Sequence, residues 1–128
     1  MGKLALKIEN LAVSYGSINA LKGINIEVEE GKIVALLGAN GAGKTTTLKT
    51  LSSLVSSERG SIILNGTDIT NMSAEKITAL GMVQSPEGRQ IFYDITVEEN
   101  LRVGAFTVKN KKEIARNFEK VYKYFPRL

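Results

Sequence analysis

The sequence predicts an α/β fold in which antiparallel strands lead into a buried strand, a glycine-rich loop and a helix. Leu4, Leu6 and Ile8 lie on one side of a period-two strand, and residues 24–28 alternate between apolar and polar side chains. Residues 33–37 are continuously apolar. An alternating strand has one face in water, but a continuously apolar strand is buried on both faces, as in a parallel sheet. The string "GANGAGKT" then separates the apolar run from a helical pattern.

Each further element follows from a local signal. Glu30-Gly31 is a turn signal that predicts a hairpin between residues 24–28 and 33–37. Ser73 and Thr96 are of the residue type that caps helix N-termini. The other predicted elements are strands at 3–9, 11–16 and 82–84, a strand followed by an Asn65-Gly66 turn, and helices beginning at Lys44, Ser73, Thr96 and Lys111. The final helix presents an apolar face, formed by Ile114, Phe118, Val121, Tyr122 and Phe125.

Composition excludes several classes of function. The 128 residues suit one domain, and they include neither cysteine nor histidine, which removes disulfides, thiolate metal sites and imidazole bases. The net charge is +4 and the basic residues are spread along most of the chain, so we expect a solvated surface and no nucleic-acid partner. No apolar run approaches the roughly 20 residues of a membrane span, and the N-terminus lacks a signal-peptide core. We therefore expect a cytoplasmic protein that reaches a membrane only through a partner.

Residues 38–45 match the phosphate-binding pattern G-x-x-x-x-G-K-[ST] at every fixed position. Glycines let the backbone approach phosphates closely, and successive amide groups at a helix N-terminus form an anion site. A lysine adds a full charge at the β- and γ-phosphates, and a threonine hydroxyl binds Mg²⁺. The predicted nucleotide-binding residues are Gly38, Ala39, Asn40, Gly41, Ala42, Gly43, Lys44, Thr45 and Thr46, with Thr45 as a magnesium ligand. A glycine-rich turn with a surface lysine is the alternative.

The longer stretch "LAVSYGSINALKGINIEVEEGKIVALLGANGAGKTTTLKTLSSL" resembles the opening of ATP-binding cassette (ABC) ATPases. The resemblance implies a P-loop NTPase core with an N-terminal antiparallel β subdomain, and ATP with Mg²⁺ as its ligands. In that family an aromatic residue after the first strands stacks on adenine, and Tyr15 occupies the matching position. The alternative for Tyr15 is a half-buried tyrosine of a strand.

Residues 81–106, "GMVQSPEGRQIFYDITVEENLRVGAF", resemble the Q-loop region of ABC ATPases that serve branched-chain amino acid importers. Most ABC ATPases have glutamine directly after the equivalent of Pro86, whereas this chain has Glu87, as that subfamily does. The resemblance therefore implies Glu87 as the catalytic Q-loop residue and a second Mg²⁺ ligand, since carboxylate oxygen suits this ion. Gln84 is the second choice, with a structural role on a strand as its alternative. A surface turn with a local ion pair is the alternative for Glu87.

The resemblance divides the chain into two parts of one ABC ATPase domain. Residues 1–85 would hold the β subdomain, the P-loop and the first core elements, and residues 86–128 would hold the Q-loop and the start of the helical subdomain. In the family that second region contacts membrane subunits. The apolar cluster of Phe92, Tyr93 and Ile95 is either a docking patch or subdomain core.

The resemblance covers only about the first half of a typical domain and ends before the signature helix. A Leu-Ser-Gly-Gly motif, a strand ending in Asp-Glu and a switch histidine are absent from the sequence. We expect this chain to bind nucleotide with negligible turnover. In the full protein, implied partners are permease subunits, a second ABC ATPase subunit packed head to tail and, indirectly, a binding protein. The alternatives are a urea or short-chain amide importer, a non-catalytic nucleotide-binding module and a small P-loop kinase.

Overall fold

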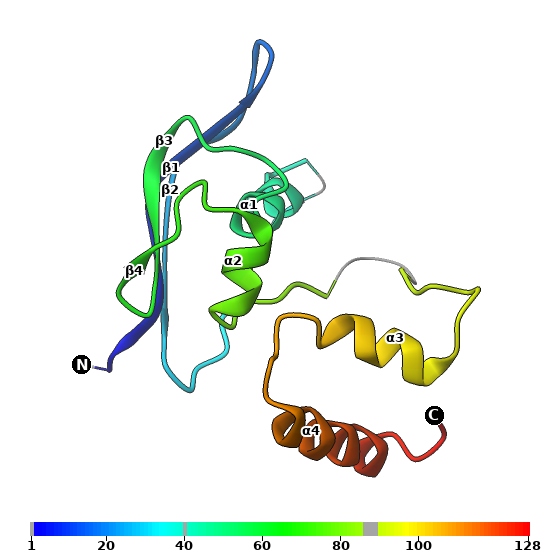
Figure 1. The fold of residues 1–128 in the computed structure, drawn as a ribbon. Coiled ribbons are helices and arrows are strands. Elements are labelled where there is room, and N and C mark those ends of the chain that lie inside the picture. The colour runs from blue at the N-terminus through cyan, green and yellow to red at the C-terminus, as the bar shows by residue number, and fades with distance from the viewer. Residues whose placement is uncertain (1, 40, 86–89) are drawn as a thin grey trace. The chain divides into compact units, whose positions relative to one another are not determined.

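The computed structural model describes residues 2–39, 41–85 and 90–128. The chain divides into two compact units, Met1–Gln84 and Ser85–Leu128. In their described parts, the first unit contains an antiparallel sheet with two helices, and the second contains two further helices (Figure 1). The candidate phosphate loop lies in the first unit.

The sheet of the first unit is built from β1 (Leu4–Tyr15), β2 (Ile18–Glu29), β3 (Arg59–Leu64) and β4 (Thr67–Asp68). Their order across the sheet is β2-β1-β3-β4, and all neighbouring strands are antiparallel. The two strands predicted at 3–9 and 11–16 are one continuous strand, β1, which is central and pairs on both sides. The β1–β2 hairpin turns at Gly16, whose φ of 60° favours glycine.

A bulge joins the two halves of β1 at Asn10. This residue has a φ of 48°, and the pairing register of β1 shifts there against both β2 and β3. The Asn10 backbone N–H donates to the Asn25 side-chain oxygen on β2 at 3.0 Å, so the bulge leaves no unpaired donor. On β3, Gly60 lies so close to Asn10 that an added Cβ would come within 2.4 Å of its carbonyl oxygen.

The predicted Asn65-Gly66 turn is confirmed. It links β3 to β4 as a two-residue loop, with Leu64 paired to Thr67. Both turn residues have positive φ, 47° for Asn65 and 83° for Gly66, which is the combination that a type I′ hairpin needs.

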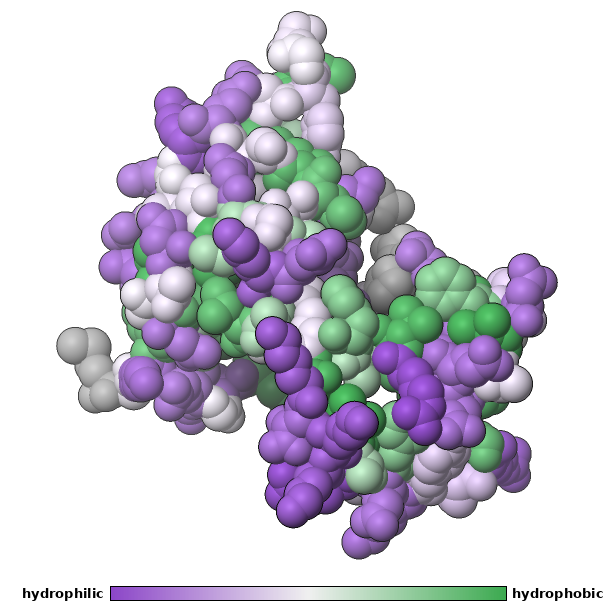
Figure 2. Space-filling model, in the orientation of Figure 1, coloured by the Kyte–Doolittle hydropathy of each residue, from purple (hydrophilic) through white to green (hydrophobic). Residues whose placement is uncertain are grey.

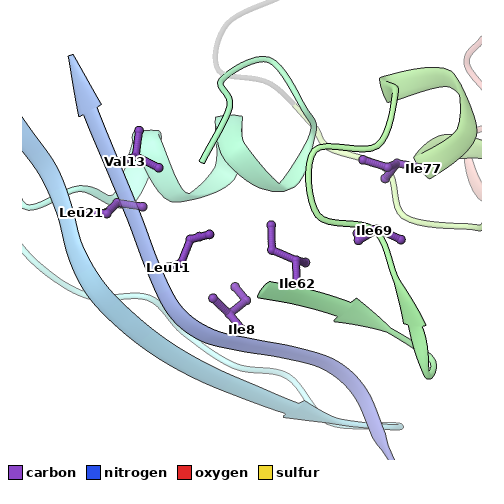
Figure 3. Packing of buried hydrophobic residues seen from close by; sticks show 7 residues of the cluster. All are labelled: Ile8, Leu11, Val13, Leu21, Ile62, Ile69 and Ile77. Carbon is purple, nitrogen blue, oxygen red and sulfur yellow. The ribbon is translucent and has the colours of Figure 1, made fainter. Parts of the chain in front are cut away.

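The hydrophobic core lies on the face of the sheet that α1 (Lys44–Leu51) and α2 (Ala74–Ala79) cover (Figure 3). Figure 3 shows Ile8, Leu11 and Ile62 pointing from the sheet toward this side. The buried cluster consists of Ile8, Leu11, Val13, Leu21, Ile62, Ile69 and Ile77. Burial of each such side chain stabilises the fold by roughly 1.5–3 kcal/mol, so this cluster holds the sheet and the helices together.

Two predicted strands are wrong. Residues 33–37 and 82–84 form no strand, and the predicted hairpin around Glu30-Gly31 does not exist because β2 pairs with β1 instead. Ile33 is 100% exposed and Leu37 is 88% exposed. A strand forms only where a neighbour accepts its hydrogen bonds, and the four strands of the described residues pair only with one another.

The second unit consists of α3 (Val97–Gly104) and α4 (Lys111–Tyr124). The predicted Thr96 cap is confirmed as a reciprocal capping box with Glu99. The Asn110 side chain caps α4 by accepting from the Lys112 and Glu113 backbone N–H groups. The two helices contact each other through their apolar faces, where the Arg102 guanidinium stands 5.0 Å from the ring centre of Phe118. In the described ranges, neither these helices nor those of the first unit are both long and apolar enough to cross a membrane.

Candidate nucleotide-binding site

The glycine-rich loop runs over residues 38–43 into the first turn of α1, and Asn40 lies outside the described residues. Gly41 and Gly43 have φ values of 87° and 100°, which non-glycine side chains rarely adopt. The Ala42 backbone N–H donates to the Ala39 carbonyl at 3.1 Å, which closes a tight turn inside the loop. Gly43 is the N-cap of α1, so the unpaired N–H groups of the helix start face the loop.

Strand β2 packs against the phosphate loop at Gly43. A Cβ added to Gly43 would lie 2.7 Å from the Leu21 side chain and 3.2 Å from the Ala20 carbonyl oxygen. Two features therefore require glycine at position 43: its positive φ and the close approach of β2. Leu21 is 4% exposed and belongs to the core, so the loop rests on the buried core of the first unit. Sequence reasoning did not identify Leu21 as a supporting residue, because its partner is 22 positions away along the chain.

Lys44 spans the loop from its end to its beginning. The half-buried Lys44 side chain donates from Nζ to the Gly38 carbonyl at 2.5 Å. An ammonium group has three donors, so this bond leaves two for an anion over the loop. The ammonium of Lys44, the glycine amides and the N-terminal end of α1 thus all place positive charge or partial charge on one side of the loop.

Tyr15 lies at the edge of the same site. Its hydroxyl donates to the Thr46 hydroxyl at 3.5 Å, which links the end of β1 to the first turn of α1. The ring is 44% exposed, so one part of it is available to a flat ligand. Its proposed contact with a base stays a prediction, and the structure brings Tyr15 within reach of the loop despite the 29 residues between Tyr15 and Thr45.

Helix α1 buries two threonines, and its half-buried Leu51 packs against the core. Thr47 and Thr50 are buried, and their hydroxyls donate to the carbonyls of Gly43 and Thr46 at 2.8 Å and 2.7 Å. Because these hydroxyls bond within the helix, burying them leaves no polar group unpaired. Leu48 is 44% exposed. The fixed Gly43–Thr47 contact ties the loop to the body of the helix.

Of the two Q-loop candidates, Glu87 and Gln84, the structure describes only Gln84. Glu87 lies outside the described residues, and its role stays a prediction. The Gln84 side-chain oxygen accepts from the Ser52 hydroxyl at 2.6 Å. Ser52 is the C-cap of α1, and the eight-residue helix is about 12 Å long, so Gln84 is bonded at the end of α1 opposite the phosphate loop.

The residues of the loop fit a nucleotide phosphate and a magnesium ion that is bound mainly through it. Thr45 is exposed at the start of α1, as a hydroxyl ligand of such an ion needs to be. In the described part of the chain there is no group of three or more carboxylate, histidine or cysteine side chains that could hold a metal. Mg²⁺ commonly keeps several waters and takes substrate phosphates with one or two protein oxygens, and a single Thr45 ligand is compatible with that pattern.

The apolar cluster of residues 91–95 lies on an ordered loop of the second unit. The Asn100 side chain accepts from the Phe92 backbone N–H at 2.9 Å and donates to the Phe92 carbonyl at 3.0 Å. Phe92 and Tyr93 are exposed within this unit, beside a hollow of about 640 Å³. Sequence reasoning missed Asn100, whose position one turn after the Thr96 cap was the available signal.

Comparison with known proteins identifies the family. Residues 21–126 match the family model described as ABC transporter. The chain is 39% identical over 123 residues to the high-affinity branched-chain amino acid transport ATP-binding protein BraG of Pseudomonas aeruginosa, which covers 96% of this chain and 52% of BraG. It is 32% identical, with the same coverage, to the probable branched-chain amino acid transport protein LivF of Archaeoglobus fulgidus. A sulfate/thiosulfate import protein, CysA of Synechocystis, is 37% identical over 79% of this chain and 28% of its own length.

Solved structures agree with this result. The structure of an ATP-binding subunit of an ABC transporter superimposes with a TM-score of 0.81 at 30% identity, covering 93% of this chain and 49% of that one. The ADP conformation of the ABC cassette MJ1267 gives 0.74 at 26% identity, covering 89% and 45%. These matches confirm the predicted fold class, the N-terminal region of a P-loop ABC ATPase with an antiparallel β subdomain. The chain spans about half the length of BraG and LivF, and it belongs to the ABC transporter family.

Proposed function

We propose that this chain is the N-terminal part of an ATP-binding subunit that powers import of branched-chain amino acids across the cytoplasmic membrane. The observation that carries the nucleotide-binding part is the loop over β2, in which Gly43 admits no side chain and Lys44 bridges to Gly38. The cargo rests on weaker support, the resemblance of residues 81–106 and the printed names of BraG and LivF. CysA, which is also similar to this chain, is named for sulfate and thiosulfate import.

In this proposal the chain's residues bind and orient ATP. The amides of residues 39–43 and the Lys44 ammonium hold the phosphates, and a phosphate oxygen replaces the Gly38 carbonyl as one partner of that ammonium. The Tyr15 ring stacks on the adenine while its hydroxyl stays next to Thr46. The Thr45 hydroxyl, with Glu87 as a second ligand, holds a magnesium ion that neutralises phosphate charge.

The proposed partners are those of a transport complex. Permease subunits would bind the exposed Phe92 and Tyr93 loop that Asn100 holds, and would keep the subunit at the inner face of the membrane. A second ATPase subunit would pack head to tail against the first, and a substrate-binding protein would act from the other side of the membrane. Hydrolysis needs a residue that positions water, so the 128 residues alone should bind ATP without releasing phosphate.

The experiment that tests this proposal compares two lysines of the same helix. Calorimetric titration of the 128-residue chain with Mg-ATP is expected to show binding that Lys44→Ala weakens by roughly 10- to 100-fold, the cost of one charge-assisted contact. Lys49→Ala is the matched control. It removes an identical side chain from the last turn of α1, away from the loop, and is expected to change affinity less than about twofold.

Equal affinity for the wild type and Lys44→Ala would contradict the assignment of the loop. Inorganic triphosphate, titrated in parallel, tests Tyr15 in the same series, because base stacking predicts tighter binding of ATP than of triphosphate. A phosphate-release assay on the same samples separates a binding module from an enzyme. Sustained turnover that disappears in Lys44→Ala would show that the chain needs nothing further for hydrolysis.

A further inference from the structure

The positive charge of the chain is concentrated in its last 20 residues. Residues 109–128 contain seven basic and two acidic side chains, a net charge of +5, whereas residues 1–108 contain ten basic and eleven acidic ones, a net charge of −1. Basic residues occur along most of the chain, but the acidic residues that balance them are scarce in residues 109–128. Helix α4 carries most of this charge.

The basic residues of α4 share one face. Lys112, Arg116, Lys120 and Lys123 follow one another at spacings of four, four and three, which at 100° per residue places them within a quarter of the helix circumference. The half-buried apolar residues, Ile114, Phe118, Val121 and Tyr122, lie on the opposite side. Three of these, Ile114, Phe118 and Val121, line a groove with α3 residues Leu101 and Gly104, so the basic face points away from α3.

Glu119 lies on the same face, between Arg116 and Lys120 in the sequence, so the face carries four basic side chains and one acidic one. None of the four basic side chains forms an ion pair in the residues that the structure describes. All four basic side chains are exposed, and the ion pairs found there join Lys3 to Glu30, Lys7 to Glu9 and Arg102 to Glu98. Figure 2 shows strongly hydrophilic surface over the first turns of α4. Lys111 and Lys112 share the first turn of α4 with Glu113.

The end of α4 adds apolar side chains to the basic ones. Tyr124 is 64% exposed and Phe125 is 62% exposed, next to Lys123 and close to Arg127. The Lys120 ammonium stands 6.0 Å from the centre of the Tyr124 ring. Aromatic side chains beside basic ones suit the boundary between lipid headgroups and acyl chains, where the ring is buried and the charge pairs with phosphate.

We propose that the basic face of α4, formed by Lys112, Arg116, Lys120 and Lys123, binds directly to the anionic phospholipid headgroups of a membrane, with Tyr124 and Phe125 inserting beside them. The positive charge of this face complements the negative charge of the headgroups. The choice of a membrane over another polyanion rests on the exposed aromatic residues and on the proposed role in a membrane transporter. This contact would be independent of the permease subunits and of nucleotide.

Flotation of the 128-residue chain with lipid vesicles tests the proposal. Vesicles of phosphatidylcholine alone are compared with vesicles containing one quarter phosphatidylglycerol, at low and at high salt. We expect binding only to the anionic vesicles, and loss of that binding at high salt because surface electrostatics are screened. Each basic residue near an anionic leaflet strengthens binding about fivefold, so Lys112→Gln, Lys120→Gln and Lys123→Gln together should weaken partitioning on the order of 100-fold.

The matched control is Lys22→Gln, Lys32→Gln and Lys76→Gln, which removes the same charge from exposed lysines of the first unit. It should weaken partitioning only a few-fold. Equal loss in both triple variants would show a net-charge effect and overturn the proposal, as would a wild type that does not float with anionic vesicles. Displacement by a duplex oligonucleotide at equal phosphate concentration would assign the face to nucleic acid instead and would also overturn it.

Two further readouts keep the test decisive. Circular dichroism of each variant checks folding, and should the α4 triple variant unfold, Lys112→Gln, Lys120→Gln and Lys123→Gln are tested singly against the single control substitutions. Mg-ATP titration of the same samples separates this proposal from the proposed function. A chain that binds anionic vesicles without binding nucleotide would leave the membrane face standing and remove the transporter ATPase role.

Discussion

Two apolar stretches of the first unit have similar composition, but one is buried and the other is exposed. Ile8, Leu11 and Val13 on β1 are at most 1% exposed, whereas Ile33 and Leu37 are 100% and 88% exposed. Strand β1 has a hydrogen-bonded neighbour on each side and a helical layer over one face. Residues 33–37 pair with no strand in the ranges that the structure describes. The difference shows that burial depends on available partners, because a strand cannot bury its backbone groups until another strand satisfies them.

The exposed stretch also lies directly before the phosphate loop. Residue 37 precedes Gly38, so the loop is anchored on its helix side by Gly43, Thr47 and Leu21 and carries an unpaired segment on its other side. This asymmetry makes the comparison relevant to function. The half of the site that is built on β2 and α1 should tolerate changes in residues 33–37, and it should not tolerate changes in the core beneath it.

The largest expected effect comes from truncating the same side chain in the two stretches. Leu11→Ala removes a 0% exposed side chain from the core and should lower the free energy of unfolding by about 3–5 kcal/mol. Leu37→Ala removes an exposed side chain and should change it by less than about 0.5 kcal/mol. Urea denaturation followed by circular dichroism measures both. A large loss in Leu37→Ala would mean that residues 33–37 are buried in solution, against the structure.

A smaller effect is expected from two glycines that both have positive φ. Gly60, with a φ of 93°, lies against β1, and an added Cβ would come within 2.4 Å of the Asn10 carbonyl oxygen. Gly31, with a φ of 74°, precedes residues 33–37, and an added Cβ there would meet nothing within 4 Å. Gly60→Ala should cost about 2–3 kcal/mol through strain and displaced backbone, and Gly31→Ala roughly 1 kcal/mol through strain alone.

The same urea experiment measures this pair. Equal costs at the two positions would show that the sheet relaxes around the Asn10 bulge and that the close approach of β3 to β1 is not rigid. The pair thus tests whether paired and unpaired parts of the first unit differ in rigidity as well as in exposure.

Local signals predicted the local structure well. The Asn65-Gly66 turn and the Ser73 and Thr96 helix caps are confirmed because each depends on residues within a few positions of one another. The two wrong strands, 33–37 and 82–84, depend on distant partners that no local pattern reports. The charge on α4 was visible in the sequence, but its restriction to one face became clear only once the apolar side of the helix was known.

The candidate site also has a part that local sequence signals predict and a part that depends on distant contacts. The glycines and Lys44 were identifiable from spacing, since a phosphate loop is a local motif. The contact of Leu21 with Gly43, and that of Tyr15 with Thr46, join residues far apart in the sequence. Gln84 shows the limit of reasoning from sequence proximity, because a residue three positions from Glu87 is bonded to the C-cap of α1.

The smallest expected effect concerns pH, and it acts only on the paired region because residues 33–37 contain no ionisable side chain. The Thr70 hydroxyl, and then its backbone N–H at 2.9 Å, hold the pKa of the Asp68 carboxyl at the end of β4 below its ordinary value of 3.8. A lowered folded-state pKa stabilises the fold above the ordinary pKa, and this stabilisation is lost as pH falls through the lowered value. Asp68→Asn should therefore have a slightly lower Tm than the wild type at about pH 6 and the same Tm at about pH 2. The control is Glu27→Gln, which removes an exposed carboxyl from β2. It should leave the Tm unchanged at both pH values. A Tm difference for Asp68→Asn that is the same at both pH values would show that the Thr70 contacts stabilise the fold independently of the charge on Asp68.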